Sequence, residues 1–210
     1  RSRRPRVAMP TVVLGDTGCI GAYKACEVLR ELQKHDVDVH VVMTHAAQQF
    51  VTALTFQTLS RNPVVTNGFD NHGWKPGHID LADRADLFLI APATANVIAE
   101  LAHGLASHSI CEIALATVAP VLIAPAMNGK MWLHPATQAN VETLRARSVE
   151  FIGPEEGQLA CGYQGTGRLW PVQEIAEKAM ALLSRKVRKP HPRFATEEAP
   201  SFATQLRGAL

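Results

Sequence analysis

Two segments of the sequence contain residues that could act together on a small acid. The first, 125–132, follows an apolar run and includes Asn128, whose amide NH2 can orient a carboxylate. The second, 157–168, is rich in glycine and includes Cys161, whose thiol can give or take a proton. Its glycines would let it close over a ligand, and Arg168 at its end offers a bidentate donor for a carboxylate or phosphate. The combination favours chemistry on a substrate that carries a carboxylate.

Each of these residues also has a purely structural explanation. Asparagine is a common turn residue, a free cysteine is usually a small buried side chain, and a glycine cluster can be a flexible turn. Met131 is the type of side chain that packs rather than reacts. His78 lies in what we expect to be a loop before the third strand, where it could act as a base, although an isolated loop histidine is more often a surface residue. The other histidines show no pairing at metal-ligand spacing, so we expect no metal site.

Strand-like and helix-like segments alternate along the chain. Apolar or β-branched runs at 11–14, 37–43, 86–91, 118–124 and 149–152 predict strands. Helical spacing follows from Ala22, from about Ala46, in a long alanine-rich segment over 95–117, and over 136–147 and 172–184. This alternation predicts an α/β fold, a three-layer doubly wound parallel sheet of the flavodoxin or Rossmann-like kind.

In such a sheet, ligands bind beyond the carboxyl ends of the strands, and polar or small residues follow four of the predicted strands. Gly15, Gly18 and Gly21 follow the first, but their spacing is not G-x-G-x-x-G, and no acidic residue ends the second strand. An NAD site is therefore disfavoured. A helix N-terminus flanked by Thr17 and Thr44 suits the phosphate of a mononucleotide such as FMN, unless the glycines only pack helix against strand. Asp16 would repel that phosphate, so we expect it to cap the helix.

Composition limits the other possibilities. Of 210 residues, 47% are hydrophobic and 19% charged, which suits one domain with a substantial core. We expect a basic leader at 1–9, the folded domain at 10–184 and a disordered tail or truncated linker at 185–210. The formal charge is only +2, and much of the basic excess lies near the two ends, so a nucleic-acid partner is poorly supported.

The cysteines and the apolar runs indicate a compartment. Four cysteines without a C-x-x-C pair predict reduced thiols in a cytoplasmic protein. No apolar stretch approaches the roughly twenty residues needed to span a bilayer, so we expect no membrane insertion.

Three motifs in order resemble those of the homo-oligomeric flavin-containing cysteine decarboxylases, over about residues 10–184. They are P-x-M-N-x-x-M-W at 125–132, His-Ile-Asp-Leu from His78, and the segment from Leu159 to Arg168, which is similar to a substrate clamp. Within this family, the chain resembles the phosphopantothenoylcysteine decarboxylases of coenzyme A biosynthesis. The chain departs from the family's usual residues at Asp16, Gly21, Glu100, Ser107 and His108.

The resemblance implies FMN as cofactor and a homo-oligomer, a trimer or trimers assembled further, with the site at a subunit boundary. His78 would be the base that assists oxidation of the substrate thiol, Asn128 would hold the carboxylate, and Cys161 would protonate the enethiolate left by decarboxylation. The implied FMN contacts are Gly15, Thr17, Gly18, Cys19, Ile20, Thr44, Ala91, Thr94 and Asn96, and the segment 22–24 resembles another FMN segment of the family. The implied substrate contacts are Asn128, Met131, Ala160, Gly162 and Arg168.

Two alternatives stay open within this resemblance. Peptidyl-cysteine decarboxylases share the motifs but lack the reductive cysteine of the clamp, so Cys161 favours 4'-phospho-N-pantothenoylcysteine as substrate. Non-catalytic flavin-binding regulatory subunits typically lose catalytic residues and carry acidic tails. Here the residues are kept and the tail is of mixed charge.

Overall fold

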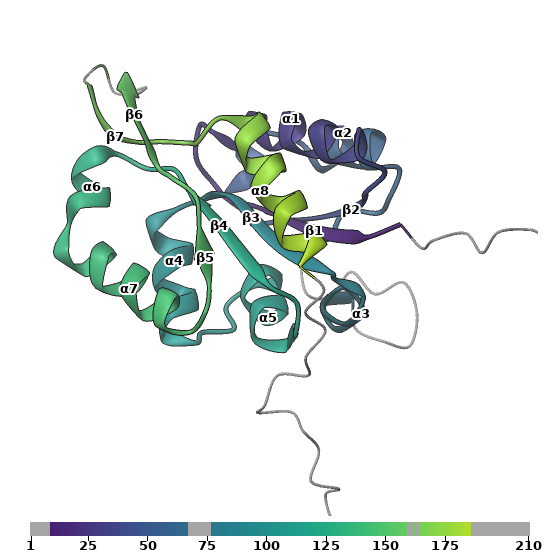
Figure 1. The fold of residues 1–210 in the computed structure, drawn as a ribbon. Helices are drawn as coiled ribbons and strands as arrows, with labels where there is room; N and C mark the ends of the chain where they lie inside the picture. The colour runs from purple at the N-terminus through teal and green to yellow at the C-terminus, as the bar shows by residue number, and fades with distance from the viewer. Residues whose placement is uncertain (1–8, 67–76, 159–161, 163, 186–210) are drawn as a thin grey trace, which may run out of the picture.

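The computed structural model describes residues 9–66, 77–158, 162 and 164–185, and its centre is a five-stranded parallel sheet. The strand order β2-β1-β3-β4-β5 confirms the doubly wound α/β fold predicted from the sequence (Figure 1). The strands are β1 (Thr11–Asp16), β2 (Asp38–Met43), β3 (Leu87–Ala93), β4 (Val121–Pro125) and β5 (Glu150–Phe151). All four strand pairs are parallel, so their carboxyl ends meet at one edge.

Helices cover both faces of the sheet, in the three layers that Figure 1 shows. On one face lie α1 (Ala22–Gln33), α2 (Ala53–Ser60) and α8 (Val172–Ser184). On the other lie α3 (Gly77–Arg84), α4 (Ala95–His103), α5 (Ser109–Ala116) and α7 (Pro135–Ala146). Short helices η1 (Ala47–Gln49) and α6 (Gly129–Leu133) follow β2 and β4.

The two faces of the sheet carry separate hydrophobic cores because side chains alternate along each strand. Val12 and Leu14 of β1 pack under α1 and α8, whereas Val13 between them packs under α3 to α5. All three side chains are fully buried, as expected of a central parallel strand covered on both faces.

The prediction of one long helix over 95–117 was wrong. α4 ends at His103 and α5 begins at Ser109, because Gly104 adopts the left-handed conformation (φ 69°) that terminates a helix. The strong helix propensity of the surrounding alanines does not carry the chain through this glycine.

The described part of the segment before Arg168 forms strands rather than the flexible loop expected from its glycines. Strands β6 (Glu155–Gln158) and β7 (Gln164–Arg168) pair antiparallel in a separate two-stranded sheet. The predicted clamp is therefore a hairpin in its described part, and its orientation is set by backbone pairing.

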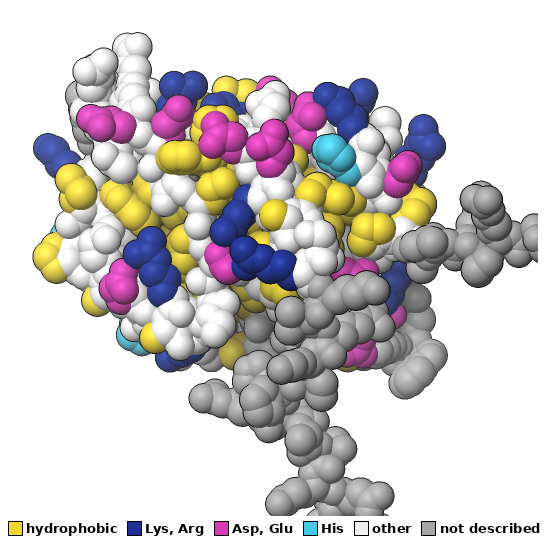
Figure 2. Space-filling model, in the orientation of Figure 1, with side chains coloured by type: hydrophobic (Ala, Val, Ile, Leu, Met, Phe, Trp, Pro, Cys, Tyr) yellow, Lys and Arg dark blue, Asp and Glu magenta, His cyan; other side chains and the backbone are white. Residues whose placement is uncertain are grey.

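The surface gives few clues of its own. On the face shown in Figure 2, basic and acidic side chains are interspersed, with no continuous basic region. Among the described helices, none is both long enough and apolar enough to cross a membrane.

Candidate active site

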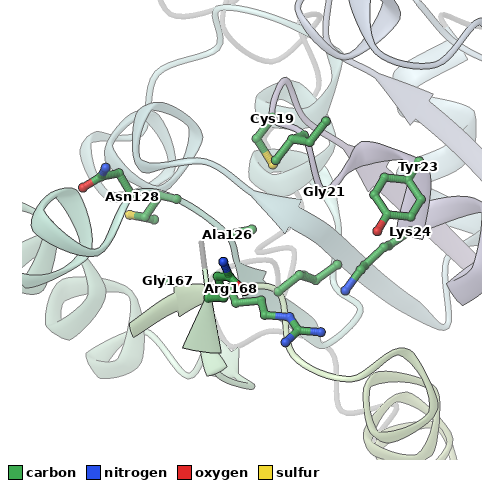
Figure 3. A pocket seen from close by; sticks show the side chains of 12 residues that line it. Cys19, Gly21, Tyr23, Lys24, Ala126, Asn128, Gly167 and Arg168 are labelled. Atoms are coloured by element: carbon green, nitrogen blue, oxygen red, sulfur yellow. The ribbon is translucent and has the colours of Figure 1, made fainter. Parts of the chain in front are cut away.

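A cavity of about 360 Å³ lies at the carboxyl edge of the sheet, within the usual size range of ligand pockets (Figure 3). Three segments form it: the β1–α1 turn with the start of α1, the β4–α6 turn, and the β6–β7 hairpin. The residues that line it are Cys19, Ile20, Gly21, Tyr23, Lys24, Ala126, Met127, Asn128, Gln158, Gly167, Arg168 and Leu169.

The structure brings together the two segments from which the sequence analysis began. The backbone N–H of Met127 donates to the carbonyl of Gly167 at 2.9 Å, which fastens the β4–α6 turn to β7. A Cβ at Gly167 would collide with the carbonyl oxygen of Met127 and lie 3.1 Å from the backbone nitrogen of Gly129. Only glycine permits this approach, so Gly167 is needed to build the cavity wall.

Asn128 both lines the cavity and caps a helix. Its Oδ1 accepts from the backbone N–H of Lys130 at 2.9 Å, so it is the N-cap of α6. In Figure 3 its amide is turned toward α6 rather than toward Lys24 and Arg168. The turn-closing explanation from the sequence is therefore correct, and the cap also fixes which end of the amide is the donor.

Two cationic side chains line the same cavity from opposite walls. Arg168, on β7, is half exposed, and its Nε lies 3.5 Å from Glu155 Oε2 across the hairpin. Lys24, on the first turn of α1, has no carboxylate within ion-pair distance among the described residues. A lysine in a first helical turn opposes the helix dipole, which favours an anion there. The pair makes the cavity suited to a ligand with a phosphate or carboxylate.

Lys24 lines the cavity, in agreement with the segment 22–24 that the resemblance associates with FMN. Gln158 is a lining residue that the predicted site omitted. No signal in the sequence marks Gln158, because its position depends on how β6 pairs with β7.

Of the predicted FMN contacts, Cys19 and Ile20 line the cavity, whereas Thr17 is buried in the same turn and does not line it. The buried Thr17 hydroxyl donates to the carbonyl of Pro92 at 2.8 Å and accepts from the backbone N–H of Thr94 at 3.0 Å. The Thr17 hydroxyl thus connects the turn after β1 to the carboxyl end of β3, and its proton is already donated to Pro92. Thr94 in turn caps α4, accepting from Val97 N at 3.4 Å.

The remaining predicted FMN contacts lie outside the cavity lining. Gly18 is packed so closely on Ala46 that a Cβ would collide with it, which supports the packing explanation of that glycine. Thr44 accepts from Ala47 N at 3.1 Å. Gly15 and Ala91 lie within the strands, and Asn96 is an exposed residue of α4.

Asp16 does not cap α1, so that prediction was wrong. β1 continues past Leu14 to Asp16, whose side chain is fully buried, and Gly21 is the N-cap instead. Neither carboxylate oxygen has a hydrogen-bond partner among the described residues. Burial raises the pKa of Asp16 from an ordinary 3.8 to about 8. Burial likewise raises the pKa of Cys19 to about 11, so its thiol stays protonated at neutral pH.

His78 lies on a helix, not in the loop expected from the sequence. It is the second residue of α3, and its Nδ1 lies 3.4 Å from Glu112 Oε2 on α5. Figure 1 shows α3 beside α5, on the face of the sheet opposite α1 and α8, and His78 is not among the residues that line the cavity. One copy of the chain does not bring this histidine to the pocket.

The structure describes two of the four remaining predicted site residues. Met131 is half exposed on α6, and Gly162 is exposed with φ 91°. Cys161 and Ala160 lie outside the described residues, as do most of the predicted leader and tail.

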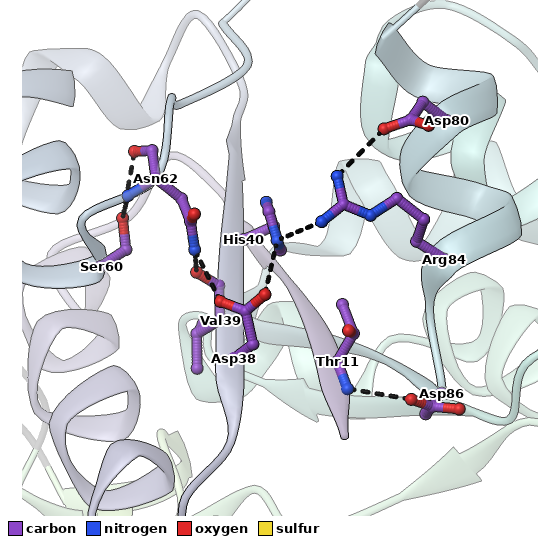
Figure 4. A network of polar contacts seen from close by, with 9 residues as sticks. All are labelled: Thr11, Asp38, Val39, His40, Ser60, Asn62, Asp80, Arg84 and Asp86. Carbon is purple, nitrogen blue, oxygen red and sulfur yellow. Dashed lines mark hydrogen bonds and ion pairs between the residues drawn. The ribbon is translucent and has the colours of Figure 1, made fainter. Parts of the chain in front are cut away.

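A second polar group, away from the cavity, joins β2 to α3 and to the segment after α2 (Figure 4). Asp38 accepts from Asn62 at 2.8 Å and lies 3.1 Å from His40, and Arg84 links His40 to Asp80 at 3.2 Å each. Partial burial acts to raise the pKa of Asp38, but the Asn62 hydrogen bond and the charges of His40 and Arg84 hold it below its usual value. His40 Nε2 faces both partners and can either donate to Asp38 or accept from Arg84, but not both at once. Because all of these polar groups face one another away from the cavity, we interpret the network as structural.

Comparison with known proteins decides the family. The sequence profile described as "Flavoprotein" matches residues 2–184, most of the chain. The chain belongs to the Flavoprotein family.

The curated relatives of this flavoprotein include bifunctional proteins of coenzyme A biosynthesis. It is 47% identical over 169 residues to CoaBC of Bacillus subtilis (strain 168), covering 80% of this chain and 42% of the relative. It is 44% identical over 174 residues to CoaBC of Mycobacterium tuberculosis (strain H37Rv), covering 83% and 41%. The chain therefore spans less than half the length of these relatives.

Solved structures of cysteine decarboxylases have the same fold. A PPC decarboxylase mutant complexed with pantothenoylaminoethenethiol superimposes with a TM-score of 0.75 at 25% identity, covering 84% of this chain and all of the other. The FMN-dependent cysteine decarboxylase SpaF gives a TM-score of 0.75 at 30% identity, covering 83% and 97%.

Proposed function

We propose that this flavoprotein is an FMN-dependent decarboxylase that converts 4'-phospho-N-pantothenoylcysteine to 4'-phosphopantetheine in coenzyme A biosynthesis. The supporting observation is the cavity in which the β4–α6 turn carrying Asn128 meets the hairpin carrying Arg168, and which Lys24 also lines. The family match, the CoaBC relatives and the PPC decarboxylase fold agree with this function.

The residues at the cavity fit FMN. Cys19, Ile20 and Tyr23 offer apolar surface for a flat ring system, and Lys24 at the start of α1 can neutralise a phosphate. When bound, FMN supplies the electron acceptor that a carboxylate beside an ordinary cysteine thiol lacks.

The chain's own side chains would then orient the substrate. The Asn128 amide, fixed by its cap to Lys130, would donate its NH2 to the carboxylate that leaves. Arg168 would hold the substrate's other anionic end, because it keeps half its surface exposed in the cavity wall. Cys161 would supply the final proton from the closed clamp.

We propose that His78 acts on the cavity of a neighbouring copy, in a homotrimer or in trimers assembled further. Glu112 would orient its ring from 3.4 Å. Two apolar side chains that line the cavity, Ile20 and Tyr23, are at least half exposed, and so are Met131 and Leu133 of α6, the helix that follows Asn128. Exposed apolar side chains of this size are expected of surface that another copy covers. We expect the enzyme to work in the cytoplasm on this small substrate, with neither a nucleic-acid nor a membrane partner.

The test is release of carbon dioxide by the FMN-loaded chain from 4'-phospho-N-pantothenoylcysteine. His78→Asn should remain yellow and folded but inactive, whereas the exposed His35→Asn should be unaffected. Mixing inactive His78→Asn with inactive Asn128→Ala should restore turnover, because each variant supplies the residue that the other lacks. No restoration after subunit exchange would refute the shared site, and no carbon dioxide from the wild type would refute the function itself.

A further inference from the structure

A group of three possible metal ligands lies at the junction of α4 and α5, apart from the cavity. Glu100 is on the last turn of α4, His108 is the N-cap of α5, and Cys111 lies three residues beyond it. The chain reverses after Gly104, so that the start of α5 returns alongside Glu100 on α4. The three-residue spacing puts His108 and Cys111 on one face of α5.

The separations within this group lie within a few tenths of an ångström of those in a tetrahedral zinc site. His108 Nε2 lies 3.0 Å from Glu100 Oε2, Cys111 Sγ lies 3.7 Å from His108 Nε2, and Cys111 Sγ lies 3.9 Å from Glu100 Oε2. Tetrahedral zinc with bonds of about 2.0–2.3 Å places its ligand atoms roughly 3.3–3.6 Å apart. Shifts of a few tenths of an ångström would put all three atoms on one ion.

The surroundings hold the carboxylate in place. Ser107 donates its hydroxyl to Glu100 Oε1 at 2.9 Å, which leaves Oε2 directed at His108 and Cys111. Such an outer hydrogen bond is the usual way in which a metal ligand is oriented. The Nδ1 of His108 has no such partner among the described residues. Of these two ligands, only Glu100 is therefore oriented by an outer hydrogen bond.

Burial and charge also suit a metal ion. Cys111 is fully buried, whereas the side chains of Glu100 and His108 are 16% and 26% exposed. An ion can thus reach the site from solvent, and water can occupy a fourth position. A carboxylate and a thiolate together balance the charge of a divalent cation. Mixed oxygen, nitrogen and sulfur ligands favour zinc over magnesium or calcium.

We propose that Glu100, His108 and Cys111 bind one zinc ion, with water as the fourth ligand, and that this ion fastens α4 to α5. Only one of the ligands is a histidine, which is why histidine spacing in the sequence did not reveal the group. The ion lies outside the cavity that we assign to FMN and substrate, so this proposal does not depend on the proposed function.

The experiment is equilibrium dialysis of the FMN-loaded full chain, freed of metal by a chelator, against zinc alone. We expect one zinc per chain, lost in Cys111→Ser and in His108→Ala. The exposed His103→Ala and the α1 variant Cys26→Ser are the matched controls and should keep it. Ser107→Ala should weaken zinc binding roughly 10–100-fold, the usual effect of removing an outer-shell partner.

Cobalt substitution of the wild type tests the thiolate ligand even if a variant fails to fold. We expect the absorption bands of tetrahedral cobalt with a thiolate-to-cobalt charge-transfer band. Absence of that band, no zinc retained by the wild type, or equal zinc in the ligand and control variants would each show that the three side chains are only a hydrogen-bonded cluster.

Discussion

Replacing Asp16 by asparagine should remove a pH dependence of stability that the wild type has. The carboxyl is fully buried, and its pKa is raised to about 8 by burial. Asparagine has nearly the same shape and no titratable group. The substitution therefore isolates the proton while it leaves the packing at the end of β1 in place.

The size of the effect follows from the two pKa values. In the unfolded chain Asp16 loses its proton near 3.8, whereas the folded protein keeps it until about pH 8. Because the folded pKa is the higher one, this stabilising contribution is complete below pH 3.8 and is lost as the pH rises through 8. At about 1.36 kcal/mol per pH unit, the free energy of unfolding falls by about 3 kcal/mol between pH 5 and 7, and by at most about 6 kcal/mol over the whole window.

Urea unfolding at pH 5, 6 and 7 and at one protein concentration measures this difference. The stability of Asp16→Asn relative to wild type should rise by about 1.4 kcal/mol for each pH unit. Asp36→Asn, at an exposed position after α1, is the control and should keep the wild-type dependence. A constant difference between Asp16→Asn and wild type from pH 5 to 7 would refute the reasoning, because Asp16 would then ionise as an ordinary carboxyl.

Three further substitutions test the site and its supports. Gly167→Ala should lower kcat/KM by roughly 100-fold in steady-state assays, because its Cβ displaces the Met127 turn, and wild-type kinetics would show that the close approach is unimportant. Gly21→Ala should raise the free energy of unfolding by about 0.4–1 kcal/mol in urea titrations, because its helical backbone leaves room for a methyl group, whereas destabilisation would contradict that geometry. Glu112→Gln should lower kcat about tenfold with KM unchanged, because it removes the carboxylate charge 3.4 Å from His78 Nδ1 while it keeps the size of the side chain, and equal activity would remove Glu112 from the mechanism.

The sequence predicted the sheet because its signals are local. Near-continuous apolar runs alternate with helical spacing, and that pattern alone indicates parallel strands covered on both faces. The meeting of the Asn128 turn with the Arg168 segment was also foreseeable, since one follows a strand end and the other carries the glycines that permit close approach.

What the sequence did not reveal depends on where elements end and on contacts between them. Gly15 suggested the end of a strand, yet β1 runs on to Asp16 and buries its carboxyl. The alanines of 95–117 hid the break at Gly104. That break places Glu100 beside Cys111. Helical spacing cannot predict this contact, because the two residues lie on different helices.

The mass of the product formed from 4'-phospho-N-pantothenoylcysteine by the FMN-loaded chain tests the central claim most directly. We expect loss of carbon dioxide alone, which corresponds to the saturated thiol and to proton delivery by Cys161. Recovery of unchanged substrate would contradict the proposed decarboxylase. Loss of carbon dioxide together with two hydrogen atoms would instead indicate an unsaturated enethiol product and would contradict the assignment of Cys161.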